Sequence, residues 1–77
     1  MIQVREGFTF GPGSGITSAS MGSEGPSHYV DIHFEGGESA TFPALSQDSA
    51  TAATNQINQG IADGHGGSTE ILIIEDF

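Results

Sequence analysis

Residues 28–42 read HYVDIHFEGGESATF, and their pattern is the strongest indication of secondary structure in the chain. Apolar and polar side chains alternate from residue 28 to residue 35, which is typical of a β-strand with one buried face. The face predicted to be buried carries Val30, Ile32 and Phe34. The opposite face carries Tyr29, Asp31 and His33. A second strand is predicted over residues 38–42, so the two runs form a β-hairpin.

The length of the connection sets the register of this hairpin. A two-residue Gly-Gly loop would place apolar residues of the first strand opposite polar residues of the second. A three-residue loop, residues 35–37, instead pairs Ile32 with Ala40 and Val30 with Phe42, and it puts a glycine where a left-handed backbone is wanted. We therefore predict the three-residue loop.

One helix is predicted after the hairpin. Pro43 ends the second strand, and Ser46 is a good N-cap because its side-chain oxygen can accept a hydrogen bond from a free amide of the first turn. An apolar stripe with spacings of three and four residues follows at Ala50, Ala53, Ile57 and Ile61. With Gly64 as the C-terminal cap, this pattern predicts a helix of about four turns.

The last predicted element is a strand over residues 69–74. Its uninterrupted run Ile-Leu-Ile-Ile, residues 71–74, is typical of a strand that is covered on both faces. We therefore expect a central strand, or a strand at an oligomer interface.

The N-terminal part is predicted to contain one strand and one long loop. Residues 2–10 carry apolar side chains at even positions, with a bulge expected where Glu6 and Gly7 break the pattern. Residues 11–27 are rich in Gly and Ser and predict a loop, within which residues 16–20 could form a short strand. The order β-loop-β-β-α-β gives an α+β fold in one domain, residues 1–77, with a small antiparallel or mixed sheet of three to four strands and one helix packed across it.

Charge is the most unusual property of the composition. Ten Asp and Glu residues face a single base, Arg5, which gives a formal net charge of −9 in 77 residues. Such a field repels nucleic acids and anionic membranes, whose recognition depends on Lys and Arg. We therefore expect a basic protein partner, no direct binding of nucleic acid and no membrane binding. The alternative is that the charge only keeps the protein dispersed.

The remaining composition limits stability and location. A hydrophobic fraction of 35% predicts a thin core, so a homo-oligomer or a complex is an expected source of extra stability. The chain has no cysteine, which excludes disulfides, thiolate metal sites and thiol nucleophiles. Without an apolar run of about 18 residues or a signal-peptide pattern, we expect a cytoplasmic protein, in the host cytoplasm if the source is viral.

No combination of side chains predicts catalysis. A metal or acid–base site would need two histidines and a carboxylate, but His28 and His33 lie on opposite faces of one strand. Asp31 and His33 share a face and could form a pH-sensitive pair or a weak cation site; the simpler interpretation is two solvated residues. The glycines of residues 11–15 invite comparison with a phosphate-binding loop, but the lysine and the following helix are missing. We predict no enzyme activity, no metal and no cofactor.

The acidic residues are the predicted binding site for a basic partner. If the last strand lies beside the hairpin, its carboxylates and those of the hairpin form one negative ridge, with a spacing along each strand of about 7 Å that imitates successive phosphates. The predicted partner-binding residues are Asp31, Glu35, Glu38, Glu70, Glu75 and Asp76. The alternative is a solvated rim that only prevents edge-to-edge aggregation.

Residues 29–61 resemble one known family in outline. The segment Phe42, Pro43, Ala44, Leu45 leads into a helix with periodic Ala and Ile, as in HicB-type antitoxins. That family's Pro-Gly after the segment and the Glu-Ala pairs of its helix are missing here, so membership is not inferred. In size and charge the chain is similar to small acidic phage proteins that block bacterial defences, including anti-CRISPRs.

These observations lead to one hypothesis and two alternatives. We expect a non-enzymatic acidic binding protein, an inhibitor of the phage or antitoxin type that mimics DNA and engages a basic, nucleic-acid-binding surface of its partner. The first alternative is a structural or assembly protein, such as a virion component or a homo-oligomeric module. The second is a small-ligand binder or enzyme that uses residues 11–27 as a lid.

Overall fold

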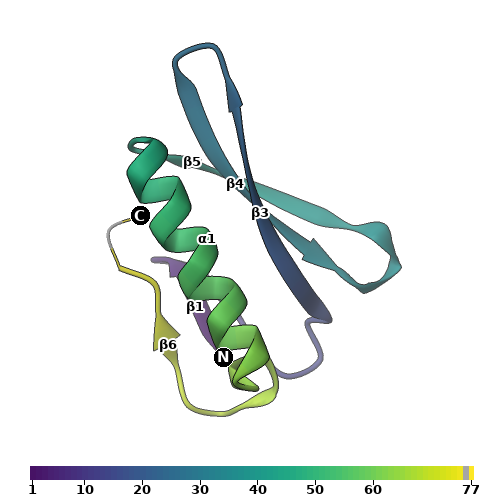
Figure 1. Ribbon diagram of the computed structural model, residues 1–77. Helices are drawn as coiled ribbons and strands as arrows, with labels where there is room; N and C mark the ends of the chain where they lie inside the picture. The colour runs from purple at the N-terminus through teal and green to yellow at the C-terminus, as the bar shows by residue number, and fades with distance from the viewer. Residues whose placement is uncertain (76) are drawn as a thin grey trace.

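The computed structural model describes residues 1–75 and 77, and it has one α-helix packed across two small sheets (Figure 1). This arrangement confirms the predicted α+β class. In chain order the elements are β1 (Ile2–Arg5), β2 (Phe8–Phe10), β3 (Ile16–Glu24), β4 (Ser27–Phe34), the 3₁₀ turn η1 (Glu35–Gly37), β5 (Ser39–Ala44), α1 (Gln47–Ala62), the 3₁₀ turn η2 (His65–Gly67) and β6 (Leu72–Ile73). The sheets have the strand orders β2-β1-β6 and β3-β4-β5, and β1 and β6 are parallel while the other pairs are antiparallel.

The predicted register of the hairpin between β4 and β5 is confirmed. Val30 pairs with Phe42 and Ile32 pairs with Ala40. The η1 turn contains the three predicted residues, and Gly37 has a φ of 87°, a left-handed conformation that glycine adopts at low cost. The alternation of residues 28–34 was therefore enough to determine this part of the sheet. The prediction that Pro43 ends the second strand is wrong, because β5 continues through Pro43 to Ala44, and an edge strand tolerates the missing amide of a proline.

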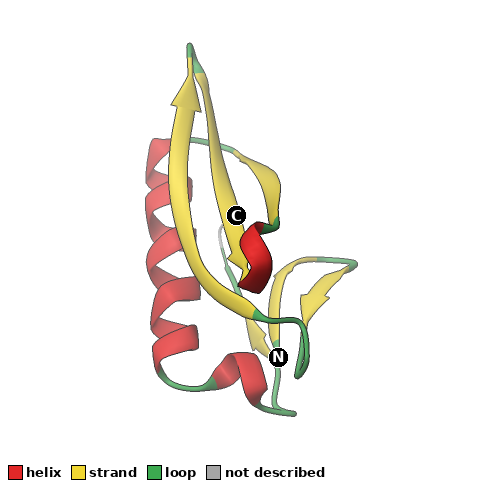
Figure 2. Cartoon of the chain, turned by 90° about the vertical axis from the view of Figure 1, so that its right-hand side faces the viewer, coloured by secondary structure: helices red, strands yellow, loops and turns green. Residues whose placement is uncertain are grey.

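The prediction of a long loop over residues 11–27 is wrong for most of its length, because β3 lies within it. β3 pairs with β4 along its whole length, with Ala19 opposite Ile32 and Met21 opposite Val30. The resulting hairpin extends beyond α1 in Figure 1, and α1 lies along one side of it in Figure 2. The composition hid this strand because its inward-facing residues are few and small, whereas β4 supplies a complete ladder of backbone partners.

The first predicted strand is in fact two strands. β1 and β2 are antiparallel, with Ile2 opposite Phe10, and Glu6 and Gly7 form the turn between them. Gly7 has a φ of 86°, which lets the chain reverse in a tight turn. The irregularity predicted near Glu6 exists as a register shift between Gln3 and Arg5, but the chain also turns back on itself there.

β6 is shorter and more exposed than predicted. It pairs with β1 at the edge of its sheet, so it is not a central strand. Ile74 is buried, but Ile71 and Ile73 are 54% and 58% exposed. The prediction of a strand covered on both faces is therefore wrong, because within the described residues nothing covers the outer face of β6. Its alternative, an oligomer interface, stays a prediction.

The helix has the predicted boundaries and buried stripe. The Ser46 Oγ accepts a hydrogen bond from the amide of Ser49 at 3.1 Å, and Gly64 takes a left-handed φ of 86° after the last turn. Ala50, Ala53 and Ile57 are buried, and Ile61 is partly buried. Their neighbours in the core are Ile2, Val4, Ala19, Val30, Ile32, Phe42 and Ile74. In the part of the chain that the structure describes, no helix is both long and apolar enough to cross a membrane.

Aromatic rings pack between the two sheets. Phe8 and Phe10 of β2 lie 5.1 Å and 6.4 Å, between ring centroids, from Phe42 of β5. Phe10 also lies 5.1 Å from Phe34, and Phe77 lies 6.2 Å from Phe42. All five phenylalanines of the chain therefore belong to one cluster, which adds to a core that is otherwise thin.

Side-chain amides of α1 connect the helix to the backbone of β3 and to that of the segment after β6. The Asn58 Oδ1 accepts a hydrogen bond from the amide of Ala19 at 2.8 Å, and the Asn58 Nδ2 donates to the carbonyl of Ala19 at 2.9 Å. Gln56 forms a longer version of this pair with the backbone of Glu75, at 3.3 Å and 3.4 Å. Each side-chain amide thus donates one hydrogen bond to the backbone of an extended segment and accepts one from it, as a neighbouring strand would.

Candidate functional site: an exposed acidic surface

Three of the predicted carboxylates lie on the hairpin between β4 and β5. Glu35 and Glu38 are exposed at the η1 turn, where the Glu35 amide donates to the carbonyl of Gly15 at 2.8 Å. Asp31 is partly buried on the outer face of β4, and its Oδ1 accepts a hydrogen bond from the Thr41 Oγ1 at 2.5 Å. The turn therefore presents two carboxylates to solvent, Glu35 and Glu38, which we call the hairpin carboxylates.

Two further predicted carboxylates lie on either side of β6. Glu70 and Glu75 are exposed, and the hydrogen bonds that position them involve their backbone groups. The Glu70 carbonyl accepts from the N-terminal ammonium of Met1 at 2.7 Å, and Glu75 pairs with Gln56. We call Glu70 and Glu75 the β6 carboxylates. Asp76, the sixth predicted residue, lies outside the described residues.

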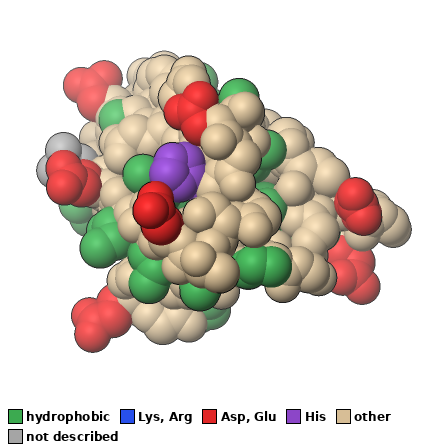
Figure 3. All heavy atoms as spheres, turned by 90° about the horizontal axis from the view of Figure 1, so that it is seen from below, with side chains coloured by type: hydrophobic (Ala, Val, Ile, Leu, Met, Phe, Trp, Pro, Cys, Tyr) green, Lys and Arg blue, Asp and Glu red, His purple; other side chains and the backbone are tan. Residues whose placement is uncertain are grey.

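The single negative ridge required β6 to lie beside the hairpin, and this condition is not met. β6 pairs with β1, whereas the hairpin belongs to the other sheet. Figure 3, which views the molecule from below, shows acidic side chains spread around that face with neutral surface between them. The described carboxylates of the predicted set therefore lie on two separate parts of the molecule, the hairpin and the two ends of β6, rather than along one track.

The single arginine is used inside the fold. A terminal nitrogen of the Arg5 guanidinium donates a hydrogen bond to the carbonyl of Pro43. The guanidinium carbon lies 4.4 Å from the ring centroid of Phe77 and 6.0 Å from that of Phe42, within the range of cation–π attraction. Since the chain has no other Lys or Arg, no basic side chain is left to offset the hairpin and β6 carboxylates, and the N-terminal ammonium lies against the carbonyl of Glu70.

Asp31 and His33 share the outer face of β4 but hydrogen-bond in opposite directions. The His33 Nε2 lies 2.7 Å from the Ser20 Oγ on β3, whereas Asp31 bonds to Thr41 on β5. These contacts do not join the two residues into a pair. His28 lies on the other face of β4 and lines a cavity against α1. Among the residues described, no three His, Asp or Glu side chains converge as metal ligands.

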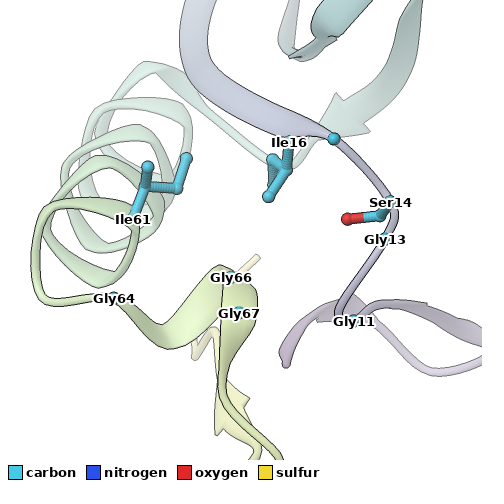
Figure 4. A pocket seen from close by; sticks show the side chains of 9 residues that line it. Gly11, Gly13, Ser14, Ile16, Ile61, Gly64, Gly66 and Gly67 are labelled. Atoms are coloured by element: carbon cyan, nitrogen blue, oxygen red, sulfur yellow. The ribbon is translucent and has the colours of Figure 1, made fainter.

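A small cavity between two glycine-rich loops was not predicted. Residues 11–15 face residues 64–67 across a volume of about 250 Å³, with Ile16 and Ile61 on its sides (Figure 4). The Ser14 Oγ is buried without a hydrogen-bond partner in the described part of the chain. The glycines of both loops were visible in the sequence, but nothing in it showed that the two loops lie opposite each other. The lining carries no charged side chain, and its volume is below the roughly 300–1,000 Å³ typical of ligand pockets.

A second cavity, of about 400 Å³, lies between α1 and β6. Its lining residues are Asn55, Gln56, Gln59, Gly60, Asp63, His65 and Leu72. We call it the α1–β6 cavity. Side-chain amides dominate its helical wall, and amides can both donate and accept hydrogen bonds. Sequence reasoning missed this site because the polar face of an isolated helix looks the same whether it borders a cavity or open solvent.

Comparisons with known protein families, with curated proteins and with solved structures give no match to this chain. Its function must therefore be argued from its charge and its surface.

Proposed function

We propose that this protein is a non-enzymatic acidic binding protein that engages a basic, nucleic-acid-binding surface of a protein partner in the cytoplasm, as an inhibitor of the phage or antitoxin type would. The observation that supports the proposal most directly is the internal use of Arg5 while Glu35, Glu38, Glu70 and Glu75 stay exposed. A net charge of −9 accelerates encounter with a basic surface and disfavours acidic partners.

The division of the carboxylates changes how the proposed recognition works. A continuous ridge would imitate one strand of a nucleic acid, whereas two separate pairs would contact two basic patches, or one pair alone would make the contact. The proposal therefore predicts that the hairpin and β6 carboxylates have separable effects on binding.

Three matched double variants test this proposal. Glu35→Gln/Glu38→Gln neutralises the hairpin pair, Glu70→Gln/Glu75→Gln neutralises the β6 pair, and Glu6→Gln/Glu24→Gln is the control. All six side chains are exposed, and each variant changes the net charge from −9 to −7. Equal charge with different positions separates a specific surface from a general electrostatic effect.

The measurement is affinity capture from a nuclease-treated lysate, with captured proteins identified by mass spectrometry. Capture is compared at 0.1 M salt, where the Debye length is about 10 Å, and at 1 M salt, where it is about 3 Å. We expect a basic nucleic-acid-binding protein at low salt that is lost at high salt and weakened by one or both site variants more than by the control. Equal capture by all three variants would assign the charge to solubility alone.

One observation favours the assembly alternative as a second candidate. Ile71 and Ile73 are more than half exposed beside a sheet edge, and exposed apolar edges often mark interfaces. Sedimentation of the unmodified protein at micromolar concentration separates the candidates. A defined large homo-oligomer would favour assembly, and a monomer would favour a different partner.

A further inference from the structure

The outer edge of β6 is open in the described part of the chain. The amide of Leu72 donates to the carbonyl of Met1 at 2.9 Å, and the amide of Ile74 donates to the carbonyl of Gln3 at 3.0 Å. In a parallel pair, alternate residues direct both backbone groups to the same side. The backbone groups of Ile73 therefore point away from β1, and among the described residues no strand pairs with them.

Apolar side chains accompany this open edge. Ile71 and Ile73 are 54% and 58% exposed, because they project from the face of β6 that α1 does not cover. An added strand would cover these side chains and satisfy the backbone groups of Ile73 at the same time. An open edge with exposed β-branched residues is the surface that such a strand recognises.

The α1–β6 cavity provides polar partners next to the edge. Gln56 already hydrogen-bonds both backbone groups of Glu75, so this wall of α1 is able to hold extended backbone. Its distances of 3.3 Å and 3.4 Å are long for such bonds, so a better-placed strand could replace them. Asp63 adds a carboxylate to the same cavity.

The charges around the edge of β6 favour a basic segment over a second copy of this chain. The β6 carboxylates flank it, and the single arginine of the chain is held elsewhere by Pro43 and Phe77. A second copy added antiparallel would bring Glu70 of one copy near Glu75 of the other, and each copy carries a net charge of −9. Like charges at such close range disfavour pairing, whereas Lys or Arg side chains would be attracted.

We infer that β6 binds an extended segment of a basic partner protein by strand addition, with apolar side chains of the segment on Ile71 and Ile73 and its Lys or Arg side chains near Glu70, Glu75 and Asp63. This inference rests on the proposed function, which it deepens by naming the mode of binding and the chemistry of the bound segment.

The test uses the full chain and a short capped peptide that alternates Lys and Val. Binding is followed by fluorescence anisotropy and by the NMR shifts of the Ile71 and Ile73 amides. A second peptide has the same residues but N-methyl groups along one backbone edge, which remove hydrogen bonding and keep the charge. We expect the N-methylated peptide to bind about tenfold more weakly, as the loss of one or two hydrogen bonds implies.

Ile73→Pro is the matching change in the protein. Proline removes the amide of Ile73 that points away from β1, while the β1 bonds of Leu72 and Ile74 stay in place. We expect a loss of about tenfold for Ile73→Pro and a smaller loss for Ile73→Thr, which keeps the amide. If Ile73→Pro fails to fold, the comparison of the two peptides still shows whether binding depends on backbone hydrogen bonds.

Three outcomes would overturn the inference. Equal binding of the two peptides, or a sedimentation dimer abolished by Ile73→Pro, excludes strand addition by a basic partner. No binding of the Lys-Val peptide to the parent protein also excludes it. If Glu70→Gln/Glu75→Gln weakens binding while N-methylation does not, the mode of binding is wrong but the proposed function stands. If the unmodified protein captures no basic protein from the lysate at 0.1 M salt, the proposed function is wrong instead.

Discussion

Replacing Asn58 by Ala tests whether α1 holds β3 in place through a side-chain amide. The substitution removes two hydrogen bonds to Ala19, of 2.8 Å and 2.9 Å, from a partly buried site. Each such bond contributes about 0.5–1.5 kcal/mol net, so their loss should cost about 1–3 kcal/mol. Ala has the higher helix propensity, which returns up to about 0.5 kcal/mol. We therefore expect a net destabilisation of about 0.5–2.5 kcal/mol.

Asn55→Ala is the control because it makes the same change on the exposed side of the same helix. The gain in helix propensity is common to both variants, so the difference between them measures the bonds of Asn58 alone. Urea unfolding followed by circular dichroism gives both free energies of unfolding. For a chain of this size, 1 kcal/mol corresponds to a shift of roughly 4–8 °C in Tm, so thermal unfolding provides an independent measurement.

Hydrogen exchange at the Ala19 amide adds a local readout. The amide should lose protection in Asn58→Ala and keep it in Asn55→Ala, because it donates to Asn58. A difference in unfolding free energy below about 0.5 kcal/mol would show that Asn58 does not hold β3 in place, since it lies within the usual range for neutral surface substitutions. Unchanged protection of Ala19 would do the same.

Three further substitutions test the core, the helix cap and the long hairpin. Ile57→Ala should destabilise the protein by about 2–4 kcal/mol in urea unfolding, because Ile57 is fully buried in the core; a cost below 1 kcal/mol would contradict its place in the core. Ser46→Ala should cost about 1 kcal/mol of helix stability through loss of the bond to the Ser49 amide, seen as a lower Tm, and an unchanged Tm would argue against the cap. Gly22→Ala should cost about 1–3 kcal/mol, because a Cβ there would lie 2.6 Å from atoms of the Tyr29 ring. Near-ultraviolet circular dichroism would register the displaced ring, and an unchanged spectrum with unchanged stability would show that the contact is not tight.

The elements that were predicted correctly are those set by local sequence. The alternation of residues 28–34 and the position of Gly37 were sufficient for the register of the hairpin. Ser46 and Gly64 were sufficient for the ends of the helix, because capping depends on neighbouring backbone groups. These signals act over a few residues, and distant parts of the chain do not change them.

The errors concern elements that depend on distant partners. β3 has a Gly- and Ser-rich sequence and becomes a strand because β4 and Asn58 provide hydrogen-bond partners on its two edges. β6 has the sequence of a fully covered strand, yet it lies at a sheet edge because β1 alone pairs with it. Nothing in residues 71–74 specifies how many neighbours the strand will have. The separation of the carboxylates into two groups follows from the same fact.

The four sheet edges of the molecule differ in how they are protected, and this difference bears on where a partner binds. Asn58 occupies part of the edge of β3, and Pro43 lies within β5, where it leaves one fewer free amide. On β2, the exposed Phe8 packs against an aromatic ring of β5. Next to β6, Gln56 bonds the backbone of Glu75 only at 3.3 Å and 3.4 Å, so this edge is less firmly protected than that of β3, and it carries the exposed Ile71 and Ile73. A weakly protected apolar edge invites pairing with an available strand. Here the surrounding negative charge disfavours a second copy of this chain and favours a strand from a basic partner protein. The charge and the open edge therefore act together to select the partner.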